Sequence, residues 1–125
     1  MKQIIYTNAA PEPIGPYSQA VQAGNMLFVS GQIAIDPATK ELIEGSVSDE
    51  AVRVMENIKV LLTKAGYSFS DIVKTTIFLT DMKYFAEVNQ VYGSYFNADF
   101  PARETVQVSA LPKFVNVEIS MIAVK

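Results

Sequence analysis

The sequence predicts an α+β fold in which two helices pack on one face of a mixed β-sheet. Short apolar or β-branched runs lie near both ends of the chain, and two segments of helical periodicity lie between them. The resulting order is βββαβαββ, with the helices segregated from most of the strands. The 125 residues suit one domain, residues 1–125, and half of them are apolar, which is enough for a hydrophobic core.

Three strands are predicted at the beginning of the chain. Two of them, Gln3–Tyr6 and Ala20–Ala23, are short and flank a proline-rich loop. The third is Met26–Ile35, which follows a Gly-Asn turn. Pro37 marks its end, because proline has no N–H group to donate to a strand ladder.

The clearest helix is predicted from about Ser48 to Ala65. Its apolar residues recur at steps of three and four, and charged residues occupy the other side. Ser46 or Ser48 can cap its N-terminus, and Gly66 can adopt the left-handed conformation that follows a helix.

A strand at Ile72–Leu79 precedes a second helix, which runs from a cap at Asp81 to about Phe96. Two further strands, Glu104–Ser109 and Val115–Val124, end the predicted order. The last strand is apolar on both faces near its end, which is typical of a strand covered on both sides. Two helices cover only one side, so identical subunits are the simplest cover for the other.

The composition excludes several kinds of site, because the chain has neither cysteine nor histidine. Disulfides, thiolate nucleophiles, zinc sites built from these residues and Ser-His-Asp relays are all ruled out. Proton transfer near neutral pH then depends on a carboxylate, Lys, Tyr or water, and we expect no metal and no other cofactor.

Charge and hydropathy argue against some classes of binding partner and some cellular locations. The net charge is −3 without a basic block, which argues against a nucleic-acid partner. No apolar run is long enough to span a membrane, and the first residues lack the apolar run of a secretory signal. We therefore expect a soluble, cytoplasmic domain.

Two charged residues are candidates for chemistry. Arg103 opens a strand and shares one face with Thr105 and Gln107; its forked donors match a carboxylate, although a surface charge is the plainer interpretation. Glu118 interrupts an apolar strand, so it either pairs with a structural cation or has a proton affinity tuned for acid–base work. If the last two strands are near one another, the two residues could share a site.

Two loop or strand features are weaker candidates. Gly15-Pro16 is turn chemistry that delivers Tyr17 at the end of a rigid loop, where it could equally be a packed aromatic. Ser30-Gly31 lies inside a strand, and a glycine there indicates a bulge or the close approach of a ligand or backbone.

Five ordered motifs, spread over essentially the whole chain, resemble the Rid family, also called YjgF/UK-114, and within it the RidA subgroup. The motifs are Pro13–Ala20, Gly24–Ile33, Thr75–Met82, Pro101–Val108 with Leu111-Pro112, and Val117–Ile119. The resemblance implies a chorismate-mutase-like fold, a homotrimer and active sites in clefts between subunits.

The resemblance also implies roles for particular residues. It places the carboxylate-binding arginine at Arg103 and the water-activating glutamate at Glu118. The remaining site positions that it matches are Tyr17, Ser30, Gly31, Asn89 and Thr105. Thr105 stands where many RidA proteins have cysteine, which puts thiol-dependent activity in doubt, and Phe114 replaces a smaller or polar residue at the cleft rim.

The activity implied is hydrolysis of short 2-imino acids and their enamine tautomers to 2-oxo acids and ammonia, a detoxification of reactive intermediates in amino-acid metabolism. Two alternatives remain at this point. One is a non-catalytic trimer that binds small carboxylates and regulates a partner enzyme, with Glu118 structural. The other is an RNA-cleaving translation inhibitor, which the acidic balance and the absence of histidine disfavour.

Overall fold

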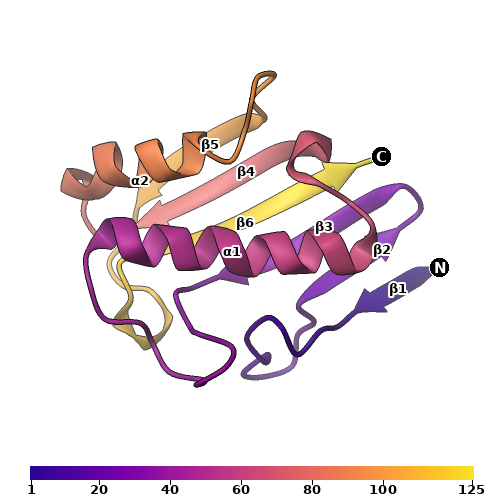
Figure 1. The fold of residues 1–125 in the computed structure, drawn as a ribbon, viewed down its shortest axis with the longest axis horizontal. Coiled ribbons are helices and arrows are strands. Elements are labelled where there is room, and N and C mark those ends of the chain that lie inside the picture. Colours follow the sequence, from indigo (N-terminus) through magenta and orange to yellow (C-terminus); the bar gives the residue numbers. More distant parts are fainter.

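The computed structural model describes residues 1–125, in which six strands form one mixed sheet and both α-helices lie on the same face of it (Figure 1). The strands are β1 (Lys2–Ile5), β2 (Ala20–Ala23), β3 (Met26–Gln32), β4 (Ile72–Leu79), β5 (Ala102–Gln107) and β6 (Val117–Val124), and the helices are α1 (Val47–Ala65) and α2 (Phe85–Gly93). The spatial order is β1-β2-β3-β6-β4-β5. Only β4 and β5 pair in parallel, because α2 forms the crossover between them. The predicted fold class and element order are confirmed.

Helix α1 begins and ends where its sequence signals predict. The Ser46 hydroxyl accepts from the Asp49 N–H at 3.1 Å, and the Asp49 carboxylate accepts from the Ser46 N–H at 3.1 Å, which is a capping box. Gly66 takes a left-handed φ of 82° and donates to carbonyls of the last turn. The apolar side of α1 is buried against alternate residues of β6, from Val117 to Ala123, and this contact is the centre of the core.

Strand β3 is shorter than the predicted Met26–Ile35. The ladder between β3 and β6 is irregular between Val29 and Gln32, so Ser30 and Gly31 form a bulge. Beyond it the chain leaves the sheet, because the buried Asn57 side chain donates to the Ile33 carbonyl at 3.2 Å and to the Ile35 carbonyl at 3.0 Å. The Asn57 side chain thus takes the place of a neighbouring strand as the hydrogen-bond donor to these two carbonyls.

The second helical segment is also divided differently from the prediction. Asp81 does cap it, accepting from the Lys83 N–H at 2.9 Å, but the first turn is a 3-10 helix at Met82–Tyr84. The α-helix itself ends at Gly93, short of Phe96. The last two strands begin at Ala102 and Val117 instead of 104 and 115, because a 3-10 turn at Pro112–Phe114 delays the start of β6.

The sheet face opposite the helices carries no covering element of this chain (Figure 1). It is formed by residues of β3, β4, β5 and β6 that alternate with the core, and it includes apolar side chains such as Phe28 and Val106, each 40% exposed. The prediction that the helices cover one face only is confirmed. No helix combines the length and apolarity that a membrane crossing requires.

Candidate functional site

Glu118 lies on the uncovered face of β6, between the buried Val117 and Ile119. Its carboxylate rests against the bulge of β3: a Cβ built on Gly31 would be only 2.8 Å from the Glu118 Cδ. Of the alternatives that the sequence allowed for this glycine, the bulge is found; the group that approaches it closely is the Glu118 side chain, where a ligand or backbone was expected. Glycine at position 31 is what lets the carboxyl group lie flat on the neighbouring strand.

The Glu118 carboxyl group has no cation beside it. The two ion pairs of the chain are Lys74–Glu104 and Lys83–Asp81, so Glu118 is in neither. Burial raises the pKa of Glu118 above its ordinary value, because desolvation disfavours the charged form. Of the two sequence-based interpretations, the structural cation is therefore not supplied by this chain. The half-buried carboxyl group borders a cavity of about 440 Å³, which we call the Glu118 cavity.

Tyr17 and Ser30 border the same cavity, together with Gly31. The Ser30 hydroxyl donates to the Ser18 carbonyl at 2.6 Å, so its oxygen lone pairs remain free to accept. The Tyr17 hydroxyl accepts from the Ile14 N–H at 3.3 Å, so its proton remains free to donate. The tyrosine is 51% exposed and is therefore not the packed aromatic of the plainer interpretation.

Gln19, which the sequence did not single out, holds the wall of this cavity in place. The residue is 2% exposed, and both the oxygen and the nitrogen of its side-chain amide form hydrogen bonds with the loop before β2. The oxygen accepts from the Thr7 N–H at 2.8 Å, and the nitrogen donates to the Thr7 and Pro11 carbonyls at 2.9 Å each. Its sequence neighbours, Ser18 and Ala20, give no signal that this polar side chain turns inward.

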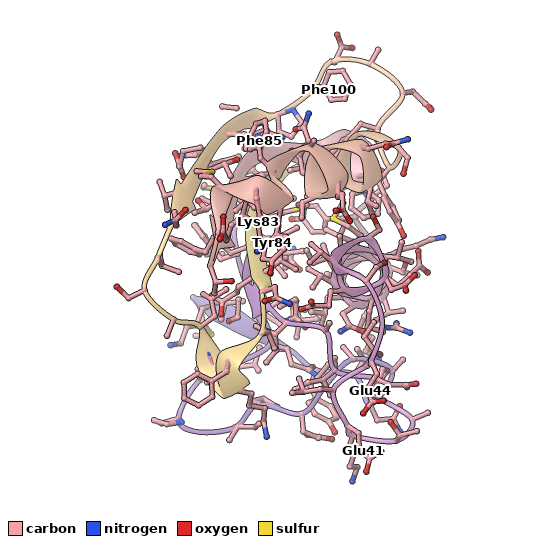
Figure 2. The ribbon with its side chains drawn as sticks, turned by 90° about the vertical axis from the view of Figure 1, so that its left-hand side faces the viewer. Glu41, Glu44, Lys83, Tyr84, Phe85 and Phe100 are labelled. Atoms are coloured by element: carbon pink, nitrogen blue, oxygen red, sulfur yellow. The ribbon has the colours of Figure 1, made fainter.

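Arg103 lies in a different pocket, of about 460 Å³, between α2 and the loop that precedes β5. Its Nη1 donates to the Asn89 Oδ1 at 2.6 Å, so these two predicted residues are together. The guanidinium carbon is 5.2 Å from the ring centre of Tyr92 and 5.7 Å from that of Phe85. Figure 2 shows Phe85 and Phe100 at this end of the molecule, opposite Glu41 and Glu44.

The aromatic partners of Arg103 could have been found from the sequence. Phe85, Asn89 and Tyr92 are spaced by four and then three residues, so they share one face of a helix. No carboxylate pairs with Arg103 in the chain, and one of its five donors is occupied by Asn89. The guanidinium keeps free donors in an aromatic pocket, which is the environment in which a planar carboxylate is bound well.

Thr105 lies two residues beyond Arg103 on the same side of β5. Its hydroxyl is buried and has no hydrogen-bond partner. It does not border the Arg103 pocket. No three acidic side chains gather in an arrangement that could hold a metal ion.

The condition under which Arg103 and Glu118 could share a site, that the last two strands are near one another, is not met within this chain. Strand β4 lies between β5 and β6, and its register shows the two residues on opposite faces. Arg103 pairs with Thr75 of β4, which is buried beneath Tyr92 on the helix-covered face. Glu118 pairs with Phe78 of the same strand, on the uncovered face. The predicted site residues thus form two separate groups in this chain: Tyr17, Ser30, Gly31 and Glu118 border one pocket and Asn89 and Arg103 another, while Thr105 borders neither.

Known proteins of one family match this chain over nearly its whole length. Residues 7–125 match the family model described as "Endoribonuclease L-PSP". A RutC family protein of Pyrococcus horikoshii is 54% identical over 125 residues, covering all of this chain and 99% of that protein. A protein of Mus musculus named 2-iminobutanoate/2-iminopropanoate deaminase is 44% identical, covering all of this chain and 93% of that protein.

Solved structures agree with this match. RidA from a Psychrobacter species superposes with a TM-score of 0.95 at 46% identity, covering 98% of this chain and 99% of that one. The Escherichia coli protein TdcF, solved with bound serine, superposes with a TM-score of 0.94 at 46% identity and covers 98% of both chains. Fold, motifs and relatives coincide over nearly every residue, and the chain therefore belongs to the Endoribonuclease L-PSP family, also called the Rid or YjgF/UK-114 family.

Proposed function

We propose that the protein hydrolyses short 2-imino acids, formed as enamine tautomers such as 2-aminoacrylate and 2-aminocrotonate, to 2-oxo acids and ammonia. The observation that carries this proposal is Arg103, a guanidinium without a carboxylate partner that Asn89 orients in an aromatic pocket. The mammalian relatives that carry the name 2-iminobutanoate/2-iminopropanoate deaminase support the reaction, and the serine bound to TdcF supports a small amino-acid-like ligand.

Arg103 binds the substrate carboxylate with the donors that Asn89 leaves free, and this fixes where the imine carbon lies. Glu118 accepts a proton from a water as that water attacks the carbon, and then returns a proton to the departing nitrogen. The raised pKa of Glu118 suits both steps, because such a carboxylate is a better base when ionised and a usable acid when protonated.

Tyr17 and Ser30 act on the polar atoms around the reacting carbon. The free hydroxyl proton of Tyr17 can be donated to the substrate or to the attacking water, and the Ser30 oxygen can accept from the imine N–H. Free imines hydrolyse in water unaided, so the enzyme has to remove only a few kcal/mol of barrier, each ~1.4 kcal/mol being tenfold.

Arg103 and Glu118 can act on one substrate only if they come from different subunits, since they lie on opposite faces of one sheet. We therefore place the active site between subunits of a homotrimer, with the uncovered sheet face buried in the assembly. The exposed apolar side chains of that face, Phe28 and Val106 among them, support this arrangement.

RNA cleavage, which the family description names, is less well supported in this chain. The net charge is −3, and the chain has no histidine to act as acid or base. An assay with single-stranded RNA beside the imine assay separates the two activities.

The test is ammonia release from freshly generated 2-aminocrotonate with and without the protein. Arg103→Lys keeps the charge but loses the fork, so we expect it to lose at least about tenfold in kcat/KM. Arg53→Lys is the matched control, since the chain has only these two arginines and Arg53 bonds Asn57 on α1. Turnover no faster than without protein would refute the deaminase, and binding of 2-oxobutanoate without turnover would favour the regulator.

A further inference from the structure

A second chamber opens directly from the Glu118 cavity. It has a volume of about 570 Å³, and half of its ten bordering residues also border the Glu118 cavity, among them Ile14, Ile35 and Lys113. The chamber therefore gives space beyond the Glu118 cavity to the side chain of a substrate whose reacting carbon lies near Glu118.

Two lysines line the chamber, and neither forms an ion pair within the chain. Lys113 stands at the boundary with the Glu118 cavity, and Lys40 stands farther out. Both have left-handed backbones, with φ of 56° at Lys113 and 64° at Lys40. Such a conformation is uncommon for a residue with a side chain, and strained backbone of this kind concentrates at ligand sites.

The one carboxylate in the chamber is already engaged. Glu12 accepts a short hydrogen bond from the Tyr6 hydroxyl, and this bond is the main reason that the pKa of Tyr6 is raised. The chamber is therefore bordered by two lysines and one carboxylate, a net charge of +1, in a chain whose net charge is −3. This local reversal of sign favours an anionic group.

We propose that the site accepts dicarboxylic 2-imino acids, with the second carboxylate held by Lys113 and Lys40. The inference rests on the proposed function, because it takes the imine carbon to lie beside Glu118. The border of the Glu118 cavity includes the polar side chains of Gln19, Gln32 and Lys113, which offer hydrogen-bonding partners to a side chain that carries a second carboxylate.

The test compares two stable 2-oxo acids of equal length, 2-oxoglutarate and 2-oxopentanoate, by calorimetry at low salt. They differ only in a terminal carboxylate or methyl group, so their affinity ratio isolates the second anion. We expect 2-oxoglutarate to bind at least about tenfold more tightly, with the ratio falling several-fold in Lys113→Met and close to one in Lys40→Met/Lys113→Met. Lys59→Met, an exposed lysine on α1, is the control that should keep the ratio.

Equal affinity of the wild-type protein for the two acids, or a ratio that survives in the double variant, overturns the inference. Hydrolysis of 2-iminoglutarate and 2-iminopentanoate, measured in parallel, should show the same preference in kcat/KM. If 2-iminobutanoate is hydrolysed but the two larger imines are not distinguished, the dicarboxylate site is wrong and the deaminase stands. If no imine is hydrolysed, the deaminase itself is wrong, whatever the affinities show.

Discussion

Gly31→Ala is the substitution that most sharply probes how Glu118 is placed. The new Cβ would lie 2.8 Å from the Glu118 Cδ and 3.0 Å from its Cγ, whereas ordinary van der Waals contact begins at 3.4 Å. The Glu118 Oε2 would be closer still, so the carboxyl group must retreat by about 1 Å or turn to another rotamer, because the β3 backbone on either side of the bulge is paired with β6 at Val29 and Gln32. Glu118 is the end of a flexible side chain, so we expect the fold to survive with at most about 1–3 kcal/mol lost from the free energy of unfolding.

Activity should suffer more than stability. A displacement of about 1 Å in a reacting group can cost about 100-fold in rate, so we expect kcat/KM for 2-iminobutanoate to fall about 100-fold, or roughly 2.7 kcal/mol. The assay is ammonia release beside a thermal unfolding curve for each variant.

A double-mutant cycle identifies the cause of the loss. If Gly31 acts only by making room for Glu118, Gly31→Ala should cost nothing further in a Glu118→Ala background. A full additive loss in that background, or wild-type turnover by Gly31→Ala, would refute the reasoning.

Two further substitutions separate the roles at the site. Glu118→Gln should slow turnover while leaving 2-oxobutanoate binding intact or tighter, because it removes a negative charge beside an anionic ligand; wild-type turnover would make Glu118 structural. Since burial raises the folded-state pKa of Glu118 above 4.5, its favourable contribution is present below that pH and is lost as pH rises through the folded value. The wild-type protein should thus lose stability relative to Glu118→Gln over this window, and pH-dependent unfolding curves that stay parallel would contradict it. Thr105→Cys should keep turnover within about tenfold, and the cysteine-free wild-type protein should ignore thiol-alkylating reagents; a gain of several orders of magnitude would show that the role of this position is misjudged.

Local features of the fold could be predicted because local chemistry decides them. Ser46, Asp49 and Gly66 mark the ends of α1 through hydrogen bonds within a few residues, and the glycine at 31 marks the bulge. The burial of alternate residues in β6 follows from the period of the strand. These signals require no knowledge of which strands are neighbours.

The arrangement of the site depends on long-range pairing, which the sequence pattern does not specify. With β4 between β5 and β6, the pairing registers put Arg103 and Glu118 on opposite faces, and no motif in either strand specifies that order or those registers. The inward turn of Gln19 and the end of β3 at Gln32 likewise depend on partners far away in the sequence. The positions of Tyr92 and Phe85, by contrast, could be predicted, because their helical spacing from Asn89 puts all three residues on one face of a helix.

The claim that one active site is shared between subunits is tested most directly by mixing two inactive variants. Arg103→Ala subunits keep Glu118, and Glu118→Ala subunits keep Arg103, so a mixed trimer contains sites with both residues intact. After co-refolding equal amounts, we expect about one quarter of wild-type imine hydrolysis, since random assembly gives that share of intact cyclic interfaces. Mixing without refolding is the control and should recover nothing. A co-refolded mixture that stays as inactive as its two parents would contradict the shared site.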